Sequence, residues 1–224
     1  MRTSAVAMAL LVSSMGSAQA ATNLLVNGSF ELPALTAADT CDGGTPWCLK
    51  GVLNTPNWTQ FGNGVTLIHN NYLGGANPPI LVLASQGVQY LDMNQFAPAL
   101  GGITQVVATT SGQQYLLSLD ASAWATNAVG ASVGYELYDP SSTAVLASGS
   151  FVAAVGGVWT TRRLVATATS ASLGVRIQAL FAPQAAMGID NVVLTAVPEP
   201  QTAALMLAGL VAVGWGWGAR RRQA

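Results

Sequence analysis

The sequence predicts an all-β protein, an antiparallel β-sandwich of the jelly-roll type. Apolar and polar residues alternate with the period of two that is typical of half-buried strands. The stretches with this pattern are 23–31, 64–69, 87–93, 101–109, 113–124, 131–139, 158–169, 171–181 and 187–197. Segments rich in Gly, Pro, Asn, Asp and Ser separate them and supply turns. Lys and Glu, which usually fill helix surfaces, are nearly absent. About nine or ten short strands at this spacing favour a sandwich.

The N-terminus has the composition of a targeting signal. Arg2 precedes the apolar stretch Ala5–Val12, and Ala18-Gln19-Ala20 places small residues at the cleavage positions. This order is typical of a secretory signal peptide. We therefore expect residues 1–20 to form a signal helix that is removed after Ala20 when the protein is exported.

Residues 21–197 then form one domain, which is long enough for a sizeable core. Four basic and eight acidic side chains give this segment a net charge of −4. Nucleic-acid binding depends on basic side chains that displace counterions from phosphates, so nucleic acid is excluded as a partner. The same charge balance argues against binding to anionic membrane surfaces.

The two cysteines, Cys41 and Cys48, lie seven residues apart in a Gly- and Pro-containing segment. In the oxidising compartment outside the cytoplasm we expect them to form a disulfide that pins a surface loop. A metal site would need more ligands nearby. A redox pair would have the C-x-x-C spacing, which differs from the spacing here.

Strand alternation divides the stretch 113–124 into two faces. One face is apolar and is expected in the core; it holds Tyr115, Leu117, Leu119, Ala121 and Ala123. The other face combines Asp120 and Trp124 with Leu116, Ser118 and Ser122. Sugars stack on indole and phenol rings while polar side chains bind their hydroxyls, so this second face is a candidate ligand surface.

Other aromatic side chains divide into candidate platforms and candidate core. Trp47 lies inside the cysteine loop and Tyr72 in a segment rich in Asn and Gly, so we expect both to be exposed. Trp58 and Trp159 start strands and are expected to pack. The candidate ligand-binding residues are therefore Trp47, Tyr72, Asp120 and Trp124.

Catalytic motifs are missing from the sequence. The chain has a single histidine, His69 at a strand end, and neither a nucleophile elbow nor a zinc-protease helix. A glycosidase would need two poised carboxylates; Asp120, Glu136 and Asp139 are the ones to inspect. We expect the protein not to be an enzyme.

The tail, residues 198–224, combines three features in a fixed order. Pro198-Glu199-Pro200 is followed by the apolar segment Ala203–Gly218 and then by Arg220, Arg221 and Arg222. This tail resembles the PEP-CTERM sorting signal of Gram-negative bacteria. The resemblance implies a partner, exosortase, and delivery to the cell surface or the extracellular matrix.

Physical dimensions agree with a transient inner-membrane anchor. Sixteen helical residues span roughly 24 Å, somewhat less than the ~30 Å hydrocarbon core. The arginines should hold the C-terminus of this single transmembrane helix in the cytoplasm.

The body of the chain resembles galactose-binding-like jelly rolls, a set that includes carbohydrate-binding modules and choice-of-anchor domains. The resemblance rests on stretches 23–33, 87–124 and 188–197. In many relatives the first and last strands lie side by side and share a structural calcium ion. The resemblance implies Glu31 and Asp190 as side-chain ligands, with a backbone carbonyl near Ser29. The alternative is that both carboxylates only cap strand ends through hydrogen bonds.

Three functions follow from these features. The first is a non-catalytic, glycan-binding domain that is exported and contacts extracellular polysaccharide. The second is a structural or adhesive protein of the biofilm matrix, because the surface is polar but poor in charge. The third is an enzyme acting on a polysaccharide.

Overall fold

The structure is a computed structural model. It describes residues 22–41, 44–51, 57–62, 64–72, 82–93, 101–123, 130–154, 156–181 and 187–198. The expected signal helix and the tail beyond Pro198 lie outside the described residues. Every regular element in the described ranges is a strand. Within these ranges no helix could span a membrane.

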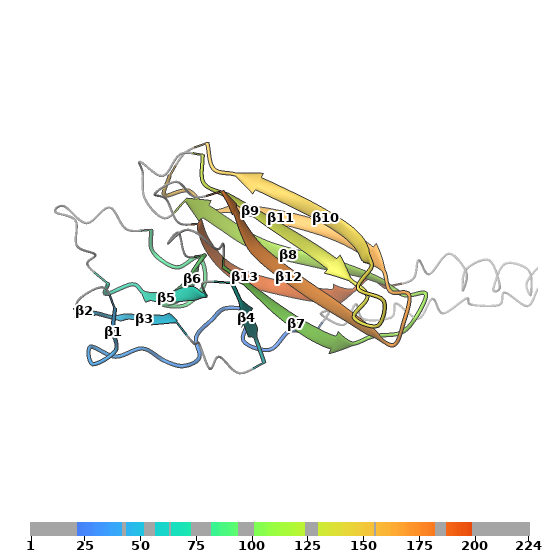
Figure 1. Cartoon of the computed structure of the whole chain (residues 1–224), viewed down its shortest axis with the longest axis horizontal. Coiled ribbons are helices and arrows are strands. Elements are labelled where there is room, and N and C mark those ends of the chain that lie inside the picture. Colours follow the sequence, from blue (N-terminus) through green and yellow to red (C-terminus); the bar gives the residue numbers. More distant parts are fainter. Residues whose placement is uncertain are drawn as a thin grey trace, which may run out of the picture.

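Two antiparallel sheets form a β-sandwich, and Figure 1 shows its longer strands running along the long axis of the molecule. One sheet has five strands in the order β10 (Val145–Val152), β9 (Ser132–Tyr138), β12 (Ser172–Phe181), β7 (Gly102–Ala108) and β4 (Thr59–Phe61). The other has six, in the order β11 (Thr160–Thr167), β8 (Gln114–Ala123), β13 (Met187–Ala196), β6 (Gln89–Met93), β5 (Val65–His69) and β3 (Cys48–Gly51). A small hairpin of β1 (Thr40–Cys41) and β2 (Thr45–Pro46) lies at one end. The predicted antiparallel β-sandwich is confirmed.

The core lies between the two sheets and follows the predicted alternation. The five residues of β8 assigned to the inner face are all buried: Tyr115, Leu117, Leu119, Ala121 and Ala123. They pack against inward-facing residues of the other sheet such as Val133, Leu137 and Ile177. Burial of apolar surface on both inner faces is the main stabilising contribution to this architecture.

The stretch 23–31, predicted as a strand, forms bends and turns instead. Asn27 and Phe30 adopt positive φ values of 54° and 56°, which interrupt extended pairing. The segment still runs beside β13, because the Leu24 amide donates to the Leu194 carbonyl and the Val192 amide donates to the Gly28 carbonyl, both at 2.8 Å. The prediction of a strand was therefore wrong, although its place next to the last strand is as expected.

Strand β10 was missed by the sequence analysis. Its middle, Ser148-Gly149-Ser150, has the composition of a turn. In the structure Gly149 pairs with Tyr135 of β9, and the Tyr135 ring occupies the space where a Cβ at Gly149 would lie. The glycine is needed for this close approach, which periodicity alone does not reveal.

Candidate functional site

A row of polar side chains crosses the outer face of the five-stranded sheet. Arg176 of β12 is the register partner of Glu136 on β9 and of Thr104 on β7, and Glu136 is in turn opposite Ser148 on β10. Residues that alternate with this row, such as Leu137 and Ile177, lie in the core, so the row faces outward. The Arg176 guanidinium donates to the Glu136 carboxylate at 2.5 Å, and both side chains remain partly exposed. This charge-assisted bond fixes a donor and an acceptor on an open surface.

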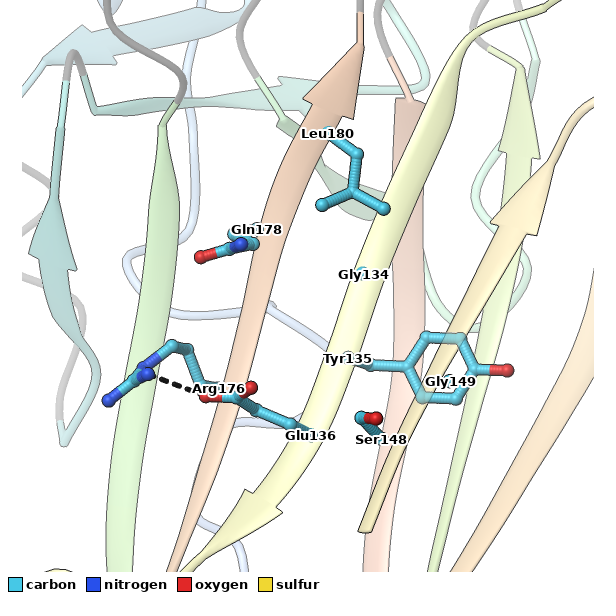
Figure 2. Close-up of a pocket in the computed structure, with 8 residues that line it drawn as sticks. All are labelled: Gly134, Tyr135, Glu136, Ser148, Gly149, Arg176, Gln178 and Leu180. Atoms are coloured by element: carbon cyan, nitrogen blue, oxygen red, sulfur yellow. Dashed lines mark hydrogen bonds and ion pairs between the residues drawn. The ribbon is translucent and has the colours of Figure 1, made fainter. Parts of the chain in front are cut away.

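A hollow of about 150 Å³ lies next to this ion pair. Figure 2 shows that its side chains come from β9, β10 and β12, with Gln178 and Leu180 on one strand and Ser148 on the opposite side. Its lining comprises Gly134, Tyr135, Glu136, Ser148, Gly149, Arg176, Gln178 and Leu180. The lining thus combines amide, guanidinium, carboxylate and hydroxyl groups with an apolar wall.

Glycines let apolar side chains lie flat on this face. A Cβ at Gly174 would overlap the Tyr138 ring, and a Cβ at Gly102 would overlap the Phe61 ring. Leu180 lies over Gly134 in the same way and is 41% exposed. The row of polar side chains is therefore bordered by apolar side chains at three places on the sheet.

The Tyr138 ring also holds Arg176 in place. The guanidinium lies 4.6 Å from the ring centroid, which is within the range of a cation–π interaction. The Tyr138 hydroxyl shares a hydrogen bond of 2.9 Å with the Thr104 hydroxyl. Arg176 is therefore fixed by Glu136 on one side and by Tyr138 below it. A preorganised donor loses little conformational entropy when a ligand binds.

This site is not among those predicted from the sequence. The signal available was a pair of opposite charges in the middle of two strands, Glu136 and Arg176, on the faces that alternation leaves outside. That these strands are neighbours, so that the two charges meet, follows only from the sheet order β10-β9-β12. Glu136 was considered only as part of a catalytic carboxylate pair.

Asp120, a predicted ligand-binding residue, is buried on the outer face of the six-stranded sheet, with 7% of its surface exposed. Its carboxylate accepts hydrogen bonds from the hydroxyls of Ser85 and Thr161, both at 2.6 Å, and from the Asn191 amide at 3.2 Å. These contacts tie the 82–88 segment to the sheet. Asp120 is engaged within the fold, whereas a sugar would need an accessible carboxylate.

The predicted disulfide is confirmed, because Cys41 and Cys48 are bridged. Beside the bridge, the Trp47 ring is half-buried and stacks on the His69 ring with centroids 4.6 Å apart. His69 Nδ1 accepts a hydrogen bond from the Asn71 amide at 2.9 Å, so this ring nitrogen is engaged within the fold.

The other aromatic candidates have different outcomes. Tyr72 is only 5% exposed and packs with the disulfide cluster, so the expectation that it is exposed was wrong. Tyr72 lies in a loop next to a hydrophobic cluster, and packing against that cluster outweighs the polar composition of the surrounding segment. Trp58 is buried as expected. Trp159 donates from its indole nitrogen to the Leu83 carbonyl at 2.7 Å and contacts the Tyr90 ring edge-on. Trp124 lies outside the described residues.

Glu31 and Asp190 meet at the 85–89 backbone. Glu31 accepts the amides of Val88 and Gln89 at 2.9 and 3.0 Å, and Asp190 accepts the amide of Gln86 at 2.8 Å. Both carboxylates thus accept backbone amides just before and at the start of β6. Ser29 is in the neighbouring turn, since Gly28 pairs with Val192.

Asp190 is fully buried and electrostatically strained. Burial raises the pKa of Asp190 to about 7 against the opposing effect of backbone hydrogen bonds from Gln86, Asn191 and Ser85, and the charge of Glu31 raises it further. Among the described residues no group of three or more His, Cys, Asp or Glu side chains could hold a metal ion. A calcium ion here would therefore need backbone carbonyls or water in addition to these two carboxylates.

The three acids considered for catalysis do not form one site. Asp120 and Glu136 lie on the outer faces of opposite sheets, and Asp139 follows β9 in a turn. Asp139 accepts hydrogen bonds from Ser141, Thr169 and Ser170. These bonds, that of Ser141 above all, hold the pKa of Asp139 well below its usual range. Each carboxylate is engaged by its own neighbours, so the paired geometry of a glycosidase is not formed by these residues.

The end of the chain matches a known family model. Residues 196–222 match the PEP-CTERM protein-sorting motif. The chain carries a PEP-CTERM sorting signal. Of its parts, Pro198 lies within the described residues, and the remaining residues of the motif, including Glu199, Pro200, Arg220, Arg221 and Arg222, lie outside them.

The body of the chain is similar in fold to carbohydrate-binding modules. TmCBM61, solved in complex with beta-1,4-galactotriose, has a TM-score of 0.53 and 13% identity, and the match covers 79% of this chain and 99% of that one. A CBM4 structure has a TM-score of 0.46 and 12% identity over 77% of this chain and 99% of that one. The CBM22-1 xylan-binding domain from Paenibacillus barcinonensis has a TM-score of 0.45 and 17% identity, over 64% of this chain and 88% of that one. No curated protein sequence matches the chain. At 13% identity and a TM-score of 0.53, the likeness to TmCBM61 is a likeness of fold alone.

Proposed function

We propose that this PEP-CTERM protein is exported, processed by an exosortase and placed at the surface or in the extracellular matrix of a Gram-negative bacterium, where it binds a glycan without cleaving it. The sorting signal at 196–222 supports the destination. The hollow beside Arg176 and Glu136 supports the binding role and is the observation on which the proposal depends.

The chemistry of the hollow suits a sugar ring. A sugar presents hydroxyls around its edge and C–H groups on its faces, so it needs donors and acceptors beside an apolar surface. Arg176 and Gln178 offer donors, Glu136 and Ser148 offer acceptors, and Leu180 offers the apolar contact. Because Arg176 and Glu136 neutralise one another, the site favours a neutral sugar over a strongly charged one.

The same arrangement argues for binding without hydrolysis. Glycoside cleavage needs two carboxyl groups on either side of the bond. Glu136 is the only acid among the described residues that line the hollow, and Arg176 holds it in an ion pair.

A structural calcium ion at Glu31 and Asp190 is a second part of the proposal. Within the described ranges, no positively charged side chain compensates the fully buried Asp190 carboxylate, which lies next to that of Glu31. The two side chains and a carbonyl near Ser29 form an oxygen-only set, which Ca²⁺ prefers. The ion would supply that charge and hold the 22–35 segment against β13.

A matrix role through protein contacts remains a second candidate, and β10 is the observation that favours it. This edge strand has eight residues, Val145–Val152, none of which is charged. Charged residues and prolines commonly protect edge strands from pairing with other chains. Concentration-dependent assembly by light scattering, unchanged by sugars, would favour this role.

The glycan-binding proposal is tested with a broad glycan array and pull-downs on insoluble polysaccharides. The matched variant is Arg176→Ala with Glu136→Ala, which removes both charges and leaves neither one unpaired. We expect the wild-type protein to be retained on at least one neutral polysaccharide and the double variant to lose retention while its melting temperature changes little. If the wild-type protein binds nothing on either platform, the glycan-binding role is wrong.

A further inference from the structure

The sorting motif begins without any linker after the folded domain. β13 is paired with β8 up to Ala196, opposite Tyr115. Val197 continues the pairing, because its amide donates to the Gln114 carbonyl at 2.8 Å and its carbonyl accepts from the Gln113 side chain at 2.5 Å. Pro198, the first residue of the Pro-Glu-Pro motif, follows directly. The motif is thus one Cα–Cα step, about 3.8 Å, from a residue fixed in the sheet.

Three loops surround this exit point, and hydrogen bonds join them into one surface. The 109–113 turn is tied to the 168–171 loop by the bonds Thr109 to Ala171, Gly112 to Ala168, and Ala168 to Gln113. The 168–171 loop is tied to the 139–144 turn, because Asp139 accepts from Thr169 and Ser170. We call these three loops the exit end; Figure 1 shows the long strands ending there, away from the β1–β2 hairpin.

The exit end is unusual in its chemistry. Its loops have the sequences TTSGQ, DPSSTA and ATSA, so Asp139 is their only charged residue. That carboxylate is 6% exposed and points into hydrogen bonds with the loops themselves. What the exit end presents outward is therefore a hydroxyl-rich and uncharged surface.

The length of chain beyond Val197 limits what can contact this surface. Val197 and Ala203, where the apolar segment of the tail starts, are six residue steps apart. Fully extended, these steps span at most about 22 Å, and lipid headgroups occupy about 5–8 Å of that distance. An enzyme that binds the motif must work in the remaining gap. A single helix of such an enzyme is about 10–12 Å across, so one helix on the domain side of the motif fills most of the gap and contacts the loops beside Val197.

We propose that the exit end is a docking surface for the membrane-embedded enzyme that reads the Pro-Glu-Pro motif, so that this enzyme recognises the folded domain as well as the tail. The inference rests on the sorting part of the proposed function. The proposal also implies an orientation of the domain while the tail is anchored. The end with the disulfide then points away from the membrane, and the two sheets lie parallel to the membrane normal.

Site-specific photo-cross-linking in cells that carry a tagged exosortase tests the contact. Benzoylphenylalanine replaces Thr110, which is exposed on the exit end, or Leu83, which is 62% exposed beside Trp159 at the opposite end. We expect an adduct with the tagged enzyme from position 110 and none from position 83. An adduct with lipid alone from position 110, or equal adducts from both positions, would overturn the proposal.

A second measurement follows the rate at which the tail is removed. Thr110→Glu with Ala171→Glu places two charges on the exit end, and we expect removal to slow at least fivefold. Inserting twelve Gly and Ser residues between Val197 and Pro198 should abolish that difference, because the enzyme then no longer meets the exit end. No effect of the charges, or an effect that persists with the spacer, refutes the docking surface. If the wild-type tail is never removed, the sorting proposal fails and this inference fails with it.

Discussion

The buried carboxylate of Asp190 gives the protein a stability that depends on pH in a predictable direction. Its pKa is raised to about 7 in the folded state, whereas an unfolded Asp has a pKa near 3.9. The folded protein therefore binds more protons between these values, and its stability falls as pH rises from about 4 to about 7. At about 1.4 kcal/mol per unit, a difference of roughly three units corresponds to about 4 kcal/mol.

The perturbation that isolates this effect is Asp190→Asn. The asparagine cannot ionise, so the pH dependence should disappear. The asparagine side chain also places an N–H group opposite the backbone N–H donors of residues 85–86. This mismatch should lower the free energy of unfolding by about 1–3 kcal/mol at pH 4–5. We therefore expect the variant to be less stable than wild type at low pH and as stable or more stable at pH 8.

Urea unfolding at pH 4.5, 6 and 8 in EDTA measures both free energies. Adding Ca²⁺ at pH 8 should raise the free energy of unfolding of the wild-type protein and leave that of the variant unchanged, because the proposed ion binds the ionised carboxylate. If wild-type stability in EDTA is flat from pH 4.5 to 8, or if the variant keeps the same slope, the reasoning about Asp190 is wrong.

Three further predictions concern other parts of the fold. Replacing Cys41 and Cys48 by Ser should cost roughly 2–3 kcal/mol in chemical unfolding, while glycan binding is retained. Asp139→Asn should lower the melting temperature at pH 7, and the difference from wild type should shrink as pH falls below 4, because the unfolded chain then binds a proton at this carboxylate while the folded protein keeps it charged. Gly174→Ala should displace the Tyr138 ring and weaken glycan binding several-fold, which calorimetry would detect; unchanged binding would count against a role for this ring.

Much of the fold could be predicted because alternation depends only on local sequence. The inner face of β8 was assigned residue by residue, since each Cβ in a strand points to the side opposite its neighbour. Alternation failed where tertiary contacts decide the backbone. The 23–31 stretch has the pattern of a strand, yet Asn27 and Phe30 turn the chain so that it follows β13 by a few bonds only.

The candidate site was harder to predict for a physical reason. Tyr72, predicted as an exposed platform, is stabilised by burial, and Asp120 is engaged by hydrogen bonds from the Ser85 and Thr161 hydroxyls. The actual hollow depends on Arg176 and Glu136 meeting across two strands that are far apart in sequence. No local pattern encodes that adjacency, because sheet order is a property of the whole chain.

The most direct test of the central claim compares two binding surfaces on one protein. Calorimetry with a glycan found on the array would measure affinity for wild type, for Gln178→Ala in the hollow, and for Trp47→Ala on the disulfide loop. We predict that Gln178→Ala weakens binding about tenfold, which corresponds to one lost hydrogen bond, and that Trp47→Ala binds like wild type. The opposite result, with binding lost only in Trp47→Ala, would contradict a site on the five-stranded sheet.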